Sequence, residues 1–240
     1  MVSATTEHVT RFDLSQRVQH VFLIASFTTL AVTGLLQLLV QAAWAQQIMR
    51  ALGDLDGVRQ IHHIAAMVLL AIFIYHVFSV VWNWVAGRSE RMLPRLQDAK
   101  DAVHSVSYLL GRRADSPQYD RFDFRQKMEY WALIWGTFLM GATGLILMFP
   151  EVVTQVVPGA VVYAAKAAHG LEALLAIGAI VTWHMYGTHL AEGLLPLDTT
   201  IFTGKISRER LMKEHPLEYE RLVKTGKFTA DQPEDSNEGQ

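Results

Sequence analysis

Four long apolar runs constrain this chain more than any other feature of its sequence. They cover residues 18–40, 61–85, 128–149 and 161–190 of the 240, and each can cross about 30 Å of hydrocarbon at about 1.5 Å per helical residue. The composition agrees, because 51% of the residues are hydrophobic and 18% are charged. A backbone in lipid must satisfy its own hydrogen bonds. We therefore predict an all-α, integral membrane four-helix bundle.

The rest of the chain is too short for a separate soluble domain. We predict one transmembrane domain over residues 1–227, followed by a polar, acidic tail at 228–240 that is expected to be disordered. The first run follows Arg11 and Arg17, but it is longer than the apolar core of a signal peptide and contains no small-residue cleavage site. It is therefore expected to remain as a membrane helix.

The distribution of Lys and Arg predicts the orientation in the membrane. Of the 21 such residues, 18 fall in the N-terminus, the loop 86–127 and the C-terminal tail, and three fall in the segments between. Because short basic segments stay in the cytoplasm, both termini are expected to be cytoplasmic. No stripe of basic and aromatic residues suggests a nucleic-acid partner.

Two segments outside the apolar runs have helical periodicity. From Leu93 onward, apolar residues recur at spacings of three and four between Pro94 and Gly111, which predicts a short amphipathic helix on the cytoplasmic membrane surface. The tail segment "ISRERLMKEHPLEYERLVKTG" is also helical in pattern, with an interruption at Pro216.

Histidine is the residue type that carries candidate chemistry. The chain has no cysteine, which excludes thiolate metal sites and iron–sulfur clusters within it. Polar residues in membrane helices are costly and by default mark a functional site. Seven of the ten histidines lie in or at the ends of the apolar runs, namely His20, His62, His63, His76, His169, His184 and His189.

Helical geometry arranges these histidines on faces. His62 and His76 are 14 residues apart, within about 40° of one face and roughly 21 Å apart along the axis. His63 differs from His76 by about 140° and points elsewhere. His169 and His184 are 15 residues apart, about 60° out of phase.

The topology then sorts the histidines by depth. His62 and His169 begin runs that enter from the outer side, whereas His20, His76 and His184 lie toward the cytoplasmic side. Histidines of different helices therefore meet at two levels. Imidazoles on opposite faces of a porphyrin hold a b-type haem, and a helical bundle can house it. No Cys-x-x-Cys-His motif is present, so the haem would not be covalently attached. A haem-free proton relay or metal transporter is the alternative, but transport would favour carboxylates beside the histidines.

The runs also show a weak internal repeat. Runs one and three both end near a Thr-Gly-Leu sequence, at residues 33–35 and 143–145, and runs two and four carry a histidine near each end. This pattern suggests a duplicated helical hairpin. Close helix packing is a sufficient explanation of the small residues.

Several motifs resemble the di-haem cytochrome b (gamma) subunit of respiratory formate dehydrogenases, and more broadly those of membrane-bound hydrogenases and thiosulfate reductases. The similarity covers nearly the whole chain. The motifs, in order, are "RFDLSQRVQH", "TGLLQL", "VRQIHH", "FRQKMEYW", "TGLILMFP", "HMY" and "GKISRERLMKEHPLEYERL".

The resemblance implies two haem b groups in a bacterial cytoplasmic (inner) membrane protein. Matched by motif, His20 and His184 would ligate the cytoplasmic-side haem, and His62 and His169 the outer haem. Arg17 and Arg59, just before ligand histidines, are candidates for the haem propionates, and interface anchoring explains them nearly as well.

The resemblance also places a quinone near the cytoplasmic haem, at the start of run three. Asp123, Arg125 and Gln126 are the candidates there to hydrogen-bond or protonate a quinone carbonyl. A solvated loop at a helix start is an equally simple interpretation.

Some histidines fall outside the family pattern. His76 and His189 are not expected in that subunit, and hydrogen bonding around the inner haem or quinone is the simplest role for both. His76 opposite His184 is an alternative pairing that would leave His20 spare, and a third haem is another. His63 is expected to contact a propionate or a helix.

We therefore predict a membrane-anchor subunit that carries electrons between an outer-side subunit and the quinone pool. Its partners would be an iron–sulfur or multihaem cytochrome subunit, docked near loops 41–60 and 150–166, and a catalytic subunit. The chain itself would form no substrate bond and supply no catalytic residue. A stand-alone small cytochrome b that oxidises superoxide or a similar reductant is the rival hypothesis.

Overall fold

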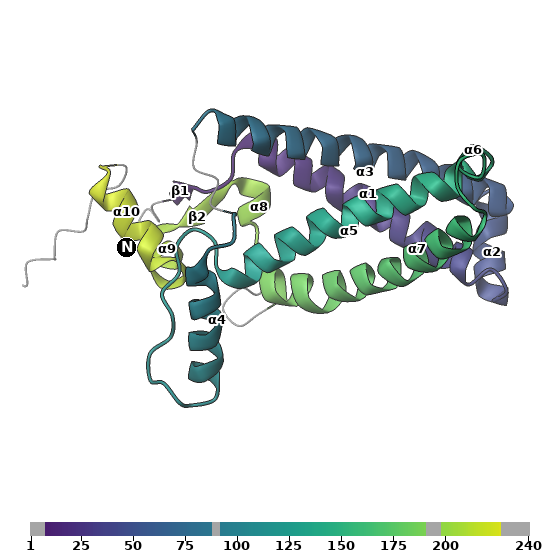
Figure 1. Cartoon of the computed structure of the whole chain (residues 1–240). Helices are drawn as coiled ribbons and strands as arrows, with labels where there is room; N and C mark the ends of the chain where they lie inside the picture. The colour runs from purple at the N-terminus through teal and green to yellow at the C-terminus, as the bar shows by residue number, and fades with distance from the viewer. Residues whose placement is uncertain (1–7, 88–91, 191–197, 227–240) are drawn as a thin grey trace, which may run out of the picture. The chain divides into compact units, whose positions relative to one another are not determined.

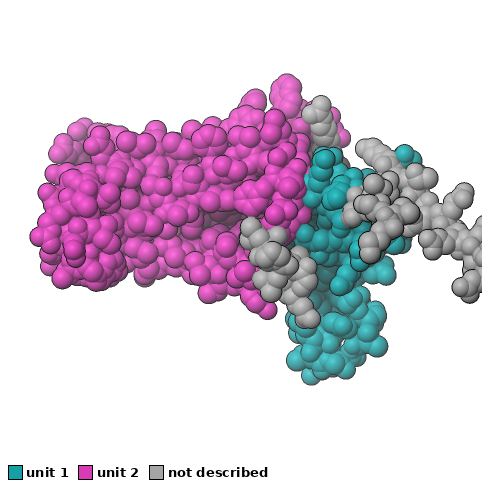
Figure 2. Space-filling view, turned by 180° about the vertical axis from the view of Figure 1, so that it is seen from behind, with its two compact units in different colours: residues 1–11, 91–128, 205–240 teal, residues 12–90, 129–204 magenta. Residues whose placement is uncertain are grey.

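A computed structural model describes residues 8–87, 92–190 and 198–226. The chain divides into two compact units, coloured separately in Figure 2. Unit 1 comprises residues 1–11, 91–128 and 205–240, and unit 2 comprises residues 12–90 and 129–204. The tail predicted to be disordered, 228–240, lies outside the described residues.

Four long helices form the bundle, and they run side by side in Figure 1. They are α1 (Leu14–Leu38), α3 (Asp54–Val85), α5 (Phe124–Met148) and α7 (Ala160–Ala179), the last continuing as the π-helical segments η1 (Ile180–His184) and η2 (Tyr186–Leu190). All four are long and apolar enough to cross a membrane. The prediction of an all-α fold with four spans is confirmed.

The surface of these helices is apolar, as expected for lipid contact. Phe78 is 64% exposed, Trp135 66% and Leu175 65%, whereas a water-soluble protein seldom exposes large contiguous apolar patches. The cluster of buried apolar residues is small and lies where α1, the short helix α2 (Ala43–Ala51) and α3 meet, and it contains Leu36, Ala45, Met49 and Val58. This cluster fixes the connection between the first two spans. The short helix α6 (Pro150–Val153) follows α5, and α8 (Thr200–Thr203) also belongs to unit 2.

Unit 1 contains the helices predicted outside the spans. The amphipathic segment forms α4 (Leu96–Leu109), and the tail forms α9 (Arg208–Glu214) and α10 (Pro216–Lys224), divided at Pro216 as the sequence indicated. Two short strands, β1 (His8–Thr10) and β2 (Lys205–Ser207), pair antiparallel and were not predicted. Three residues of each strand are too few to show a period in the sequence.

Buried charges hold the ends of the chain together within unit 1. Glu218 is 3% exposed and accepts from Arg11 Nη1 at 2.8 Å and from Arg121 at 3.2 Å. Burial lowers the pKa of Arg11, although Glu218 acts against that shift. His215 donates from Nδ1 to the Asp120 carbonyl at 2.8 Å and accepts at Nε2 from Arg11 Nη2 at 2.9 Å. Burial, with Arg11 alongside, lowers the pKa of His215 to about 4.

Candidate functional site

The outer level of the bundle contains one cross-hairpin histidine pair. His62 on α3 and His169 on α7 have ring centres 6.4 Å apart, with an interplanar angle of 63°. Each Nδ1 atom meets a threonine hydroxyl of a neighbouring helix, at 2.8 Å from Thr33 on α1 and 2.9 Å from Thr143 on α5. The two rings are therefore held in the same way.

Both threonines fix the imidazole tautomer. The Thr33 hydroxyl donates to the Thr29 carbonyl at 2.6 Å, and the Thr143 hydroxyl donates to the Leu139 carbonyl at 2.7 Å. Because each hydroxyl proton is used within its own helix, the oxygen must accept from the histidine Nδ1–H. In the described part of the chain, neither Nε2 has a hydrogen bond. Nε2 is thus the nitrogen that can bind a metal.

A glycine follows each of these threonines and makes room for the ring. A Cβ atom on Gly34 would lie 3.5 Å from His62 Cε1, and one on Gly144 would lie 3.3 Å from His169 Cε1. A larger side chain at either glycine would occupy the space of the ring. The Thr-Gly pairs thus support histidines, a role beyond the helix packing that the sequence suggested.

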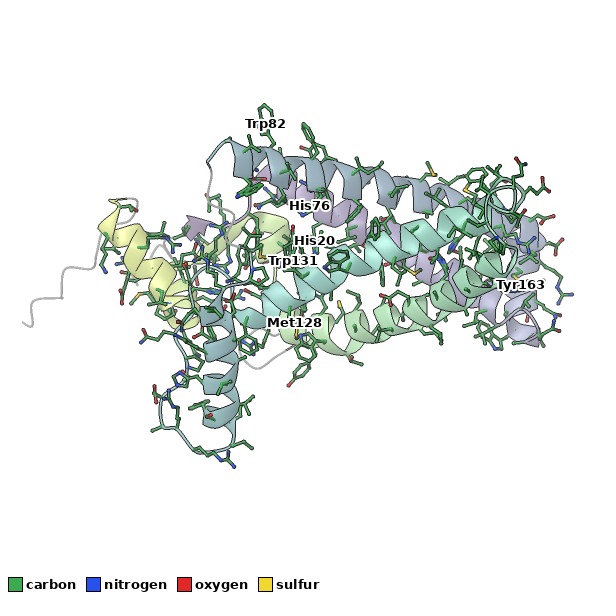
Figure 3. The ribbon with its side chains drawn as sticks, viewed as in Figure 1. His20, His76, Trp82, Met128, Trp131 and Tyr163 are labelled. Atoms are coloured by element: carbon green, nitrogen blue, oxygen red, sulfur yellow. The ribbon has the colours of Figure 1, made fainter. Side chains whose placement is uncertain are left out.

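The second pair lies at the other level. His20 on α1 and His184 at the end of η1 have ring centres 6.3 Å apart, at 40°. His184 Nδ1 donates to Glu129 Oε2 at 3.1 Å. His20 Nδ1 is buried and has no hydrogen-bond partner among the described residues. Figure 3 places His20 in the same part of the bundle as His76, away from the end that carries Tyr163.

His189 is a second histidine near His184. Their ring centres are 6.2 Å apart at 85°, and His189 is only 7% exposed. Both residues belong to consecutive π-helical turns of one segment, so their rings project from the same backbone. A porphyrin plane between them would meet that backbone, which favours His20 over His189 as the partner of His184.

His76 uses both ring nitrogens in hydrogen bonds. Nδ1 donates to Gln19 Oε1 at 2.9 Å, and Nε2 accepts from the Tyr130 hydroxyl at 2.9 Å. The His76 and Tyr130 rings are 5.6 Å apart. This arrangement matches the hydrogen-bonding role expected for His76 and leaves no nitrogen for a metal.

The two hairpins prove to be related in detail. "RFDLSQ" at 11–16 recurs as "RFDFRQ" at 121–126, and Thr33-Gly34 recurs as Thr143-Gly144, in each case 110 residues later. The same offset relates Gln19 to Glu129, which hold His76 and His184 respectively.

The second helices of the hairpins follow the same relation. His62 corresponds to His169, and His76 corresponds to His184. Their spacings are 14 and 15 residues, and η1 accounts for the difference because a π-helical turn accommodates an additional residue.

The remaining predicted ligands of haem groups lie as follows. His63 lines an open apolar groove with Ile64 and Met67. Arg59 lies 3.6 Å from Asp56 and is 54% exposed. Arg17 donates from Nε to the Phe202 carbonyl at 2.7 Å.

The three quinone candidates form the N-terminus of α5. Asp123 Oδ1 accepts from the Gln126 backbone N–H at 2.9 Å, and Gln126 Oε1 accepts from the Asp123 N–H at 3.2 Å, which is a capping box. Arg125 pairs with Asp123 at 2.7 Å. Asp13 and Gln16 make the same capping box on α1. The structure thus shows a local role for Asp123 and Gln126 that the repeat duplicates.

The histidine groups suit a large planar cofactor better than a bare ion. Among the described residues, no group of three or more His, Cys, Asp or Glu side chains could hold a metal ion. A haem supplies four nitrogens of its own and needs only two from the protein.

Comparison with known proteins agrees with this geometry. A family model of prokaryotic cytochrome b561 matches residues 11–196. The chain belongs to the prokaryotic cytochrome b561 family. It is also 24% identical, over 237 residues, to the cytochrome b556(Fdn) subunit of nitrate-inducible formate dehydrogenase from Escherichia coli strain K12, with 96% of this chain and 97% of that subunit covered. The subunits of Escherichia coli O157:H7 and Shigella flexneri match equally.

Membership in the cytochrome b561 family confirms the resemblance and implies haem b as the cofactor. The sequence interpretation did not identify the residues that support the histidines, which are Thr33, Thr143, Gln19, Glu129 and Tyr130. The signal was available in the 110-residue offset, because the same offset superposes the caps, the Thr-Gly pairs and the Gln19 and Glu129 positions.

Proposed function

We propose that this chain is a two-haem electron carrier that links an outer-side redox subunit to the quinone pool. The observation that carries the proposal is the presence of two cross-helix imidazole pairs with ring centres 6.4 and 6.3 Å apart. Two imidazoles that bind one metal ion from opposite sides at about 2.0–2.1 Å have ring centres about 6 Å apart. The donor set therefore fits a bis-histidine haem at each level.

In this assignment, His62 and His169 hold the outer haem, and His20 and His184 hold the inner haem. Bound haem supplies reversible one-electron transfer. The protein orients each ligand ring through the Nδ1 acceptors at His62, His169 and His184. His76 is assigned to hydrogen bonding, because Gln19 and Tyr130 occupy both of its nitrogens.

Haem quantitation of purified variants tests the ligand assignment. We expect two haem b groups per wild-type chain and one in each of His169→Ala and His184→Ala. His20→Ala should also lose the inner haem, whereas His76→Ala should keep both. Loss of a haem in His76→Ala, with two retained in His20→Ala, would overturn the inner pairing.

The partners are proposed from the relatives. The matched subunits belong to a formate dehydrogenase, so we propose a catalytic subunit and an outer electron-transfer subunit that docks at loops 41–60 and 150–166. The basic segments place both termini in the cytoplasm of a bacterial inner membrane. Copurification from the native membrane, followed by identification of the bound subunits, tests this assembly.

The quinone site is proposed at the start of α5, with Asp123, Arg125 and Gln126 as contacts. The repeat offers a matched control, because Asp13 caps α1 as Asp123 caps α5. Asp123→Ala should slow reoxidation of the reduced haems by a quinone about tenfold, whereas Asp13→Ala should only weaken its helix, by about 1 kcal/mol. Equal slowing in both variants would reduce Asp123 to a helix cap.

A further inference from the structure

One intramembrane histidine is held by a carboxylate, unlike the others. Thr33 and Thr143 present hydroxyls to His62 and His169, and Gln19 presents an amide oxygen to His76. Only His184 donates its Nδ1–H to an acidic side chain, Glu129. Since the repeat places Gln19 and Glu129 at equivalent positions, the two hairpins differ at this point by an amide and a carboxylate.

The Glu129 side chain is directed to this single histidine. It lies on α5, is 26% exposed, and has His184 as its only ion-pair or hydrogen-bond partner in the described part of the chain. An acidic group within a membrane span is costly unless it is paired. No Lys or Arg among the described residues neutralises it, so its charge acts on the His184 ring.

The equivalent position in the other hairpin supports a specific role for this charge. Gln19 orients His76 as Glu129 orients His184, at 2.9 and 3.1 Å. His76 Nε2 is occupied by Tyr130, whereas His184 Nε2 has no hydrogen bond in the described residues. The carboxylate therefore accompanies the histidine that can bind a metal, and the neutral amide accompanies the one that cannot.

We propose that Glu129 is a positioning residue that sets the redox potential of the inner haem, an inference that rests on the proposed ligand role of His184. A carboxylate that accepts the Nδ1–H of a ligand histidine fixes the ring and raises its basicity. A more basic ligand and a nearby negative charge both favour the oxidised iron, which carries the larger positive charge. Glu129 thus lowers the midpoint potential of the inner haem relative to a neutral acceptor.

Redox titration of the α band in the purified protein tests the role of Glu129. The component lost in His184→Ala identifies the inner haem. In Glu129→Gln, we expect its reduction equilibrium to shift about tenfold toward the reduced form, which is about 59 mV for one electron, with the outer component unchanged. An unchanged inner potential in a variant that retains two haems overturns the proposal.

Gln19→Glu is the matched control, because it creates the same carboxylate beside His76. Its effect on either potential should be less than half that of Glu129→Gln, and an equal effect would show that the charge acts without His184. Glu129→Asp, which keeps the charge but draws it back from the ring, should raise the inner potential by less than Glu129→Gln. If Glu129→Gln fails to retain the inner haem, an unchanged potential in the aspartate variant overturns the proposal.

The proposed function can fail separately from the role of Glu129. A wild-type chain with a haem content other than two, or His184→Ala protein that keeps both haems, would contradict the ligand assignment itself. An unresponsive inner potential in two-haem Glu129→Gln protein would contradict only the role of Glu129.

Discussion

The outer and inner histidine levels differ in how closely they follow the internal repeat. At the outer level, His62 and His169 are equivalent, and each is held by an equivalent threonine. At the inner level, the equivalent histidines are His76 and His184, but they do not pair with each other. His184 faces His20, and His76 bonds Tyr130.

One substitution position explains this asymmetry. Tyr130 lies 110 residues after His20, so the repeat places a phenol in the second hairpin where the first has an imidazole. The Tyr130 hydroxyl closes on His76 Nε2, which leaves one inner pair of histidines instead of two. A duplicated scaffold thus gives a symmetric outer site and a single inner site.

The largest expected effect follows from the close approach of glycine to the outer ring. Gly144→Leu would place its side chain at the His169 ring, since a Cβ there lies 3.3 Å from Cε1. We expect loss of the outer haem and half the wild-type haem content, measured as haem per chain. Gly178→Leu is the control, because a Cβ on Gly178 meets nothing within 4 Å. Two retained haems in Gly144→Leu would show that the outer site tolerates a displaced ring.

A smaller effect is expected from the hydrogen-bonded histidine of the inner level. His76→Ala removes both of its hydrogen bonds and leaves Tyr130 and Gln19 short of a partner, which should cost about 1–3 kcal/mol. The midpoint of thermal unfolding should fall while both haems remain. Tyr130→Phe removes one of the two bonds and should cost less. A red-shifted or missing haem band in His76→Ala would place His76 in a cofactor site.

The symmetry of the outer level can be tested with Thr33→Val and Thr143→Val. Each change keeps the shape of the side chain but removes the acceptor of a histidine Nδ1–H, at a cost of about 0.5–1.5 kcal/mol. Haem dissociation from the outer site should accelerate to a similar extent in both variants, and the inner haem should be unaffected. Unequal effects would show that the two outer ligands are not equivalent.

The smallest effect concerns a histidine that lies outside the spans and serves as a structural reference. His215, like His76, has both nitrogens occupied, and its pKa is lowered to about 4 from 6.5. Below pH 6.5, the unfolded state binds a proton that the folded state excludes, so unit 1 should lose stability as the pH falls from 6.5 toward 4.

Hydrogen exchange of residues 205–226 as a function of pH measures this loss. The exchange should quicken on acidification, and His215→Asn, which has no titrating group, should show a weaker pH dependence. An identical pH profile in the variant would assign the effect to another group of unit 1.

Part of the site could be predicted from the sequence. The four spans follow from hydrophobic length, and the depth of His62, His76, His169 and His184 follows from their spacing along helices. The structure brings His62 to His169 and His20 to His184, as the motifs implied. The partners of each Nδ1 could not be predicted by helical period alone, because they lie on neighbouring helices 26 to 57 residues away.

The sequence by itself determined the helices, their membrane character and the residue types available to hold a cofactor, because these depend on local composition and spacing. The tertiary structure decided which of the repeated histidines has a nitrogen available. That choice depends on side chains from separate helices that meet only after packing, namely Thr33 and Thr143 at the outer level and Tyr130 and Glu129 at the inner level.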